Sequence, residues 1–177
     1  MATATITSDQ NAVIAEVFIA APPSRVFEAI SDPAQTPKWW GQGGLYRVTR
    51  ATSDVRVGGK WRSEGLGADG VTFFVEGEYL EVDPPRRLVH TWIGSYSNVK
   101  TVVYWELEPQ GVHNLQASGP KKSGTGTFVR VRQEGFAGNH ELALSHGEGW
   151  KRVLGWLEAF TVKGETVETR PAAEEKK

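Results

Sequence analysis

The chain has 177 residues, 39% of them apolar, which suits a single domain with one buried core. Its formal net charge is −1, from 20 basic and 21 acidic residues. Nucleic-acid binding usually needs a basic stripe that displaces counterions from phosphates, and the sequence has none, so we expect no nucleic-acid partner. The absence of cysteine excludes disulfides, zinc–thiolate sites and cysteine nucleophiles.

The N-terminal residues 1–10 are polar and lack the basic and apolar segments of a signal peptide. No apolar run approaches the roughly 20 residues that span a bilayer. We therefore expect a cytoplasmic protein with no membrane partner, in which residues 1–10 form a flexible tail.

The first part of the chain predicts one strand and two short helices. Residues 11–20 form the strand, because apolar side chains alternate along them. The prolines at 22–23 end it and open a helix, since proline is tolerated in a first helical turn, where no intrahelical partner awaits its missing N–H. A second short helix follows over residues 32–41.

From there to residue 134 the sequence predicts strands joined by turns. The paired prolines at 84–85 mark a turn, because proline cannot join a ladder. Residues 109–125 have few large apolar side chains and predict a mobile hairpin loop. Glu76 and Glu78 share one strand face, which we expect to be wet, because burying two like charges is costly. The expected strands cover residues 46–49, 60–62, 71–82, 88–93, 101–107 and 127–133.

The last expected element is a helix over at least residues 149–162, where apolar residues repeat at helical spacing and form one broad face. Residues 164–177 are charged and poor in apolar side chains, so we expect a flexible tail. This order of elements predicts an α+β domain over residues 11–163, with an antiparallel sheet of about six or seven strands. The terminal helix is long enough to cover that sheet.

Short motifs run through the chain from about residue 14 to residue 160. They are Ala21-Pro22-Pro23-Ser24-Arg25-Val26-Phe27, Asp32-Pro33 before Trp39-Trp40, Val57-Gly58-Gly59-Lys60-Trp61, Val82-Asp83-Pro84-Pro85-Arg86-Arg87-Leu88, Gly135-Phe136 and His146-Gly147-Glu148-Gly149-Trp150. Through them the chain resembles the START-like (SRPBCC, helix-grip) superfamily, specifically bacterial homologues of the C-terminal domain of the activator of heat-shock-protein-90 ATPase. The resemblance implies a curved sheet wrapped around the C-terminal helix. It says less about function, because the superfamily shares a container and not a chemistry.

Seven tryptophans are about three times the number that ordinary usage gives a chain of this length. Strand alternation points several of them toward the expected helix, and the resemblance places two more at a cavity rim. Large aromatic side chains around a concave sheet can line an apolar ligand pocket, but they can equally fill a solid core, and both interpretations stay open. The candidate ligand-binding residues are Trp39, Trp40, Trp61, His90, Trp92, Val103, Trp105, Val129, His146, Trp150 and Leu154.

Catalytic and metal-binding motifs are absent from the sequence. His140 and His146 are six residues apart, which does not match the zinc-protease spacing of four. Ser145 and His146 are neighbours, but no nucleophile elbow or third triad member accompanies them. We therefore expect no metal, no cofactor and no catalytic residue. His90 and His146 are the titratable groups best placed to reach a ligand.

Three functions remain open, of which binding of a hydrophobic or aromatic small molecule between sheet and helix is the first. The second, which the resemblance allows, is a polyketide cyclase-like or aromatase-like enzyme. The third is a co-chaperone-like module in the stress response, as the family's name implies. Nothing before residue 11 could supply the additional N-terminal domain that does much of the chaperone binding in eukaryotic activators, so we do not expect chaperone binding. A homodimer through a sheet edge or the helix also stays open.

Overall fold

The structure, a computed structural model, describes residues 1–112 and 124–174. These residues form three helices and one antiparallel nine-stranded sheet in the order β1-β2-β9-β8-β7-β6-β5-β4-β3. The strands are β1 (Thr3–Ile6), β2 (Ala12–Ile19), β3 (Gly41–Gln42), β4 (Tyr46–Ser53), β5 (Lys60–Gly67), β6 (Thr72–Asp83), β7 (Arg87–Gly94), β8 (Thr101–Val112) and β9 (Gly124–Glu134). The helices are α1 (Pro23–Ser31), α2 (Thr36–Trp39) and α3 (His140–Lys163).

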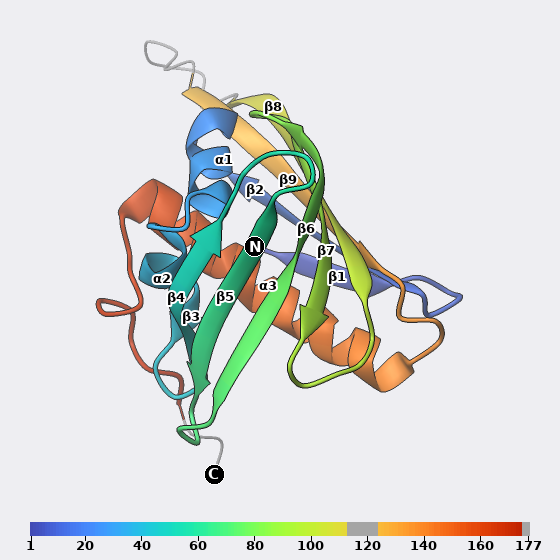
Figure 1. Ribbon diagram of the computed structural model, residues 1–177. Helices are drawn as coiled ribbons and strands as arrows, with labels where there is room; N and C mark the ends of the chain where they lie inside the picture. Colours follow the sequence, from blue (N-terminus) through green and yellow to red (C-terminus); the bar gives the residue numbers. More distant parts are fainter. Residues whose placement is uncertain (113–123, 175–177) are drawn as a thin grey trace.

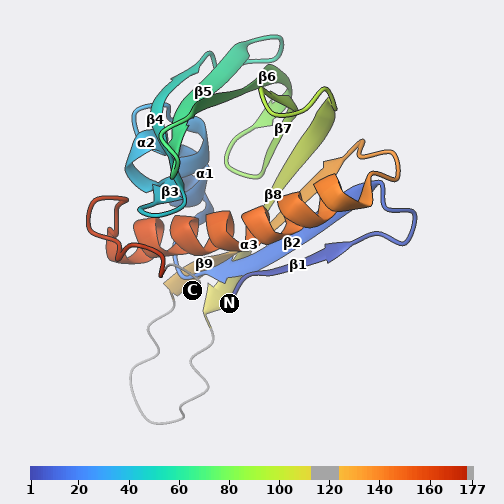
Figure 2. The same ribbon diagram turned by 90° about the horizontal axis from the view of Figure 1, so that it is seen from below.

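The sheet curves around α3, which runs along its concave face (Figure 1). Figure 2 shows β4, β5, β6 and β7 on one side of this helix and β1 and β2 on the other, with β8 and β9 passing behind it. Helices α1 and α2 connect β2, near one edge of the sheet, to β3 at the opposite edge. This is the helix-grip fold, so the α+β class, the two short helices and the covering helix that the sequence predicts are confirmed.

Alternation along β2 places its apolar side chains in the core. Val13, Ala15, Val17 and Ile19 are at most 2% exposed. In the sheet β2 pairs with β9, with Ala15 opposite Val131. Helix α3 packs mainly on β2, and this contact joins the sheet and the helix in one apolar core.

Helix α3 begins at His140, nine residues before residue 149, where the predicted minimum extent of this helix begins. Asn139 caps it, because its side-chain oxygen accepts a hydrogen bond from the Leu142 amide at 3.1 Å. Gly164 ends the helix in the left-handed conformation, with φ 70°. Gly147 and Gly149 weaken the helical signal in the first half, and tertiary packing overrides that weak preference.

The N-terminal segment 1–10 is not a flexible tail, because β1 lies within it. Residues Thr3 to Ile6 pair with β2, with Thr3 opposite Glu16. Ala4 and Ile6 on the strand and Ala2 just before it alternate along the chain and pack against the core. An edge strand of an antiparallel sheet buries one face only, and here two of the three partly buried residues are alanines. The composition of the segment is therefore mostly polar, which is why the sequence does not predict a strand. Together with the two-residue β3, β1 raises the strand number from the expected six or seven to nine.

The C-terminal segment also differs from the expected tail as far as residue 174. Val167 and Arg170 are buried at 6% and 8% exposure. The Val167 amide donates to the Lys38 carbonyl at 2.8 Å, and the Arg170 guanidinium donates to the carbonyls of Trp39 and Gly41. These hydrogen bonds to backbone carbonyls hold the segment against α2 and β3. Such bonds produce no apolar pattern in the sequence, so composition alone predicts a flexible tail.

The predicted loop over residues 109–125 is shorter than expected. Strands β8 and β9 continue into it as a paired ribbon, with Gln110 opposite Gly126 and Val112 opposite Gly124. A ladder of backbone hydrogen bonds can extend beyond the core without large apolar side chains, which is why the composition suggested a loop. Residues 113–123 lie outside the described part of the chain.

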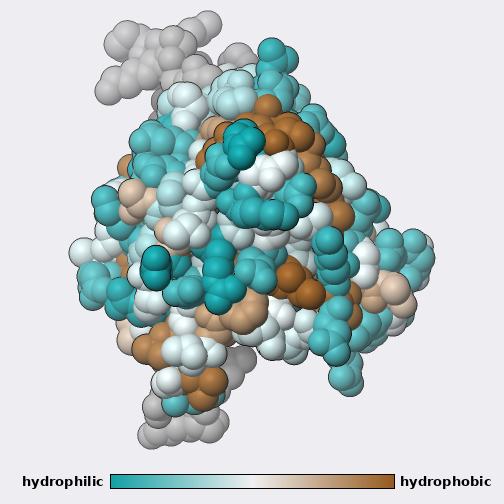
Figure 3. Space-filling model, viewed as in Figure 1, coloured by the Kyte–Doolittle hydropathy of each residue, from teal (hydrophilic) through white to brown (hydrophobic). Residues whose placement is uncertain are grey.

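The outer face of β5 and β6 carries cross-strand ion pairs. Lys60 contacts Glu78 at 2.7 Å, and Arg62 contacts Glu76 at 2.7 Å. In Figure 3 hydrophilic side chains cover much of this side of the molecule and hydrophobic ones form smaller groups. The expected wet face at Glu76 and Glu78 is confirmed. Among the described residues, no helix has the length and apolar character needed to cross a bilayer.

Candidate functional site

A cavity of about 610 Å³ opens between the first half of α3 and strands β4, β5, β6 and β7. Its wall is mainly apolar. Its exposed lining residues lie around the β5–β6 turn, on the β7–β8 loop and on α3, and we call this side of the cavity its entrance. A volume of this size falls within the range of about 300–1,000 Å³ that small-molecule pockets occupy. The aromatic residues of the wall are Trp40, Tyr46, Trp61, Phe73, Trp92, Tyr96 and Trp150.

Four indoles form a continuous aromatic surface along one side of the cavity. The ring centroid of Trp92 lies 5.3 Å from that of Trp61 and 6.1 Å from that of Trp40. Trp150 reaches the same group from α3, with its centroid 6.3 Å from that of Trp92. These spacings are those of aromatic pairs in contact, so the indoles stabilise one another and present their remaining faces to the cavity.

The Trp150 indole is fixed by a buried polar network. Its Nε1 donates to Gln133 Oε1 at 2.8 Å, and Gln133 Nε2 donates to Thr101 Oγ1 at 2.8 Å. Gln133 is completely buried on β9, and Thr101 is 2% exposed on β8. The network therefore joins α3 to two strands and holds the indole in one orientation.

His90 lies behind the aromatic surface, next to a second cavity of about 50 Å³. Its Nδ1 lies 3.1 Å from the Thr91 carbonyl oxygen, and its Nε2 lies 3.2 Å from Trp105 Nε1. A carbonyl can only accept and an indole N–H can only donate, so the proton is on Nδ1 and the ring is neutral. Burial lowers the pKa of His90 to about 4, which agrees with that state. Both ring nitrogens already have hydrogen-bond partners, so His90 stabilises the packing behind the aromatic surface.

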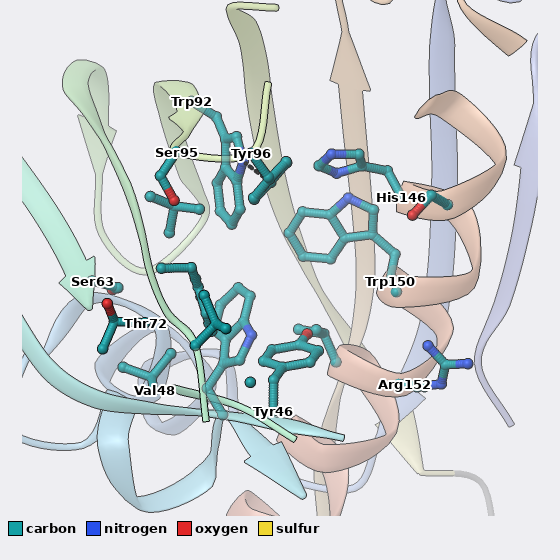
Figure 4. A pocket seen from close by; sticks show the side chains of 18 of the residues that line it. Tyr46, Val48, Ser63, Thr72, Trp92, Ser95, Tyr96, His146, Trp150 and Arg152 are labelled. Atoms are coloured by element: carbon teal, nitrogen blue, oxygen red, sulfur yellow. Dashed lines mark hydrogen bonds between the residues drawn. The ribbon is translucent and has the colours of Figure 1, made fainter. Parts of the chain in front are cut away.

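His146 projects from α3 toward the cavity between Tyr96 and Trp150 (Figure 4). Its ring centroid lies 5.2 Å from Phe136, 6.0 Å from Tyr96 and 6.4 Å from Trp92. No hydrogen bond joins its ring to another described residue. Burial lowers the pKa of His146 to about 4, so the ring is neutral and offers a ligand one donor and one acceptor.

The remaining polar groups of the wall are hydroxyls and two opposite charges. Trp92 Nε1 donates to the Tyr96 hydroxyl at 3.1 Å, a contact drawn as a dashed line in Figure 4. Burial raises the pKa of Tyr46, so its phenol keeps its proton. Asp69 on the β5–β6 turn and Arg152 on α3 are the charged groups, and both are exposed. Within residues 1–112 and 124–174 no cluster of acidic or histidine side chains could hold a metal ion.

The predicted site residues divide into three groups. The first group lines the large cavity and consists of Trp40, Trp61, Trp92, His146 and Trp150. The second group, His90 and Trp105, lines the small cavity behind it. The third group lies in the core away from both cavities and consists of Trp39, Val103, Val129 and Leu154. Trp39, placed at the rim by resemblance, is completely buried and donates from Nε1 to the Ala29 carbonyl at 2.9 Å.

The sequence interpretation missed several residues of the wall. Alternation with Trp61 could have indicated Ser63, and helical spacing from His146 could have indicated Gly149 and Val153. The polar residues of the entrance come from turns, whose side-chain directions no periodicity predicts. The missed residues are Tyr46, Val48, Ser63, Gly67, Asp69, Val71, Thr72, Phe73, Val75, Ser95, Tyr96, Leu142, Ser145, Gly149, Arg152 and Val153.

Solved structures with this fold cover almost the whole chain. A protein from Rhodobacter sphaeroides is 20% identical with a TM-score of 0.71, and the match covers 93% of this chain and 100% of that one. A protein from Chromobacterium violaceum is 25% identical with a TM-score of 0.62, over 85% of this chain and 96% of that one. DynU16, a putative protein in the dynemicin biosynthetic locus, is 20% identical with a TM-score of 0.66. That match covers 89% of this chain and 49% of DynU16.

At such identities the likeness to the Rhodobacter protein and to DynU16 supports the fold alone. No curated protein matches the chain. The family model described as Activator of Hsp90 ATPase homolog 1-like protein matches residues 20–115, which is more than half of the chain. This match covers α1, α2 and strands β3 to β8, the elements that supply most of the cavity wall. The chain therefore belongs to the Activator of Hsp90 ATPase homolog 1-like family.

Proposed function

We propose that this protein binds a small apolar or aromatic molecule in the cavity between α3 and the sheet. The observation that carries the proposal is the cavity of about 610 Å³ with Trp40, Trp61, Trp92 and Trp150 in its wall. Burying an apolar ligand against indoles is favourable by about 25 cal/mol for each Å² removed from water. The hydroxyls and His146 would orient the ligand.

The glycines of α3 allow a direct test. Gly149 lines the cavity, and a Cβ built on it meets no atom within 4 Å, so the side chain of Gly149→Leu starts in open space and should reduce the cavity volume. Gly155 on the same helix is equally open around its Cβ but does not line the cavity. Gly155→Leu is therefore a matched control for changes in helix propensity and surface.

The measurement is intrinsic fluorescence during titration with a panel of hydrophobic and aromatic compounds. We expect a saturable change in the wild type and in Gly155→Leu, and weaker binding in Gly149→Leu, most of all for the larger compounds. The fluorescence response should also shrink in Trp92→Phe but not in Trp156→Phe, because Trp156 lies outside the cavity wall. An affinity in Gly149→Leu equal to that of Gly155→Leu for every compound would show that the ligand occupies another place and would refute the proposal.

A cyclase-like enzyme with the same cavity is the second candidate. The observation that favours it is His146, whose ring faces the cavity without a hydrogen bond to another described residue. A neutral imidazole can take a proton from a bound substrate, which is the requirement for general base catalysis. Its test is turnover of each compound that binds, compared between wild type and His146→Gln. Unchanged turnover in the variant would remove this candidate's base.

A further inference from the structure

The cavity has an unequal distribution of charge between its inner wall and its entrance. The inner wall consists of indoles, aliphatic side chains and hydroxyls. The two charged groups, Asp69 and Arg152, are both exposed and therefore lie where the cavity meets solvent. An ionic group of a ligand would keep its hydration at the entrance and lose it on the inner wall. Any charge on the ligand therefore belongs at the entrance.

Arg152 lies on the side of α3 that borders the cavity entrance. Ser145, Gly149 and Arg152 follow one another at helical spacing on this side, and all three line the cavity. Figure 4 shows the Arg152 guanidinium beside the helix, apart from the group of indoles. Trp150 projects from the opposite flank of the same helical face and is buried.

The guanidinium of Arg152 makes no ion pair or hydrogen bond with any other described residue. Glu148, one helical turn earlier, contacts Lys151 Nζ at 2.6 Å. The carboxylate of Asp69 is used differently, since its Oδ1 accepts a hydrogen bond from the Val71 amide at 2.9 Å and helps to form the β5–β6 turn. The cationic group is therefore the one left with its donors available to a ligand.

We propose that the ligand is an amphiphile whose anionic group, a carboxylate or sulfonate, binds Arg152 while its apolar part lies against the indoles. This inference rests on the function proposed above and specifies the ligand class for the same cavity. A guanidinium offers paired N–H donors that match the two oxygens of such an anion. The apolar part would contribute most of the affinity, and Arg152 would select among apolar molecules.

Two fluorescent probes that differ by one group make the test specific. The probes are 1-anilinonaphthalene-8-sulfonate and N-phenyl-1-naphthylamine, which share the same aromatic skeleton and differ by the sulfonate. The variants are Arg152→Gln and, as a control with the same change in net charge, Lys151→Gln. Lys151 directly precedes Arg152 on α3 but does not line the cavity.

We expect Arg152→Gln to weaken binding of the sulfonate probe by about fivefold, as for a solvent-exposed ion pair, and to leave the neutral probe unchanged. Lys151→Gln should change neither probe. Added salt should weaken the sulfonate probe in wild type more than in Arg152→Gln. Asp69→Asn, which keeps the oxygen that accepts from Val71, should strengthen the sulfonate probe because it removes a like charge from the cavity.

The outcomes separate the two proposals. If the neutral probe binds and is weakened by Gly149→Leu, while the affinity of the sulfonate probe is unchanged by Arg152→Gln, the cavity function stands and the anionic ligand class is refuted. The same conclusion follows if both probes lose affinity equally in Arg152→Gln. If neither probe binds the wild-type protein, the function proposed for the cavity fails together with this inference.

Discussion

The buried hydrogen bond between Trp150 and Gln133 should couple the stabilities of variants at these two positions. Trp150→Phe keeps an aromatic ring in the cavity wall but removes the N–H that donates to Gln133 Oε1 at 2.8 Å. Because Gln133 is completely buried, its oxygen is then left without a donor, which costs about 1–3 kcal/mol. Gln133→Met leaves the indole N–H without an acceptor and also removes the donor to Thr101 Oγ1. The second loss is the same in the Gln133→Met single variant and in the double variant, so it cancels in the cycle.

The double variant has neither orphaned group. If each single variant loses about 2 kcal/mol through the broken bond, additivity predicts a loss of about 4 kcal/mol. Because the orphaned group that causes the loss in each single variant is absent from the double variant, we expect the double to lose at most about 2 kcal/mol. The coupling energy should therefore be at least about 2 kcal/mol. Packing differences between the side chains enter the singles and the double alike and largely cancel in the cycle.

The assay is urea unfolding followed by far-ultraviolet circular dichroism, which does not depend on the fluorescence of the altered indole. The control cycle combines Gln133→Met with Trp156→Phe, whose indole donates to Gln42 and not to Gln133. That cycle should be additive within about 0.5 kcal/mol. Equal coupling in both cycles, or none in either, would refute the role assigned to the bond.

Three further predictions concern stability. Gly77→Ala should cost at least 2 kcal/mol, roughly, because its Cβ would lie 2.0 Å from a backbone oxygen of β7, whereas Gly155→Ala on α3 meets nothing and should stabilise by about 0.5–1 kcal/mol. Chemical denaturation compares the two, and equal effects would contradict the clash. Arg170→Gln should lower the melting temperature and speed proteolysis after residue 164, since it breaks buried hydrogen bonds to backbone carbonyls; unchanged proteolysis would show that the segment is held otherwise. His90 and His146 have a pKa of about 4 in the folded protein and an ordinary pKa of 6.5 in the unfolded chain, so between pH 6.5 and 4 mainly the unfolded chain takes up protons. The free energy of unfolding should therefore fall over this range, with a contribution from His90 of about 2 kcal/mol at pH 5. A urea-unfolding profile that is flat between pH 6.5 and 4 would exclude this linkage.

The sequence predicts the fold well wherever burial leaves a periodic pattern. Alternation identifies β2, and helical spacing identifies the second half of α3, because both bury one continuous apolar row. The edge strand β1 and the segment around Arg170 escape prediction for a common reason. They are held by backbone hydrogen bonds and by one buried guanidinium, and such contacts leave no period in the sequence.

The cavity is predicted only in part. Trp61, Trp92 and Trp150 were expected in its wall because they lie on elements whose inward face is recognisable. The same argument selected Val103 and Val129, which are packed in the core, since alternation gives a side chain's face and not its depth. Arg152 was missed because it is exposed on a helix, where a charged residue is ordinarily a solvated one.

The pairing of β2 with β9 has a consequence for the synthesis of the protein. Glu16 on β2 lies opposite Arg130 on β9, and the two are 114 residues apart in the chain. During translation β2 emerges long before its partner, and α3, which covers its apolar face, emerges later still. Until then the strand has one unpaired edge and an uncovered face, which is the condition under which nascent chains associate with one another. The domain should therefore complete its folding only after the ribosome has released nearly all of it, and fragments that stop before β9 should be recovered as aggregates.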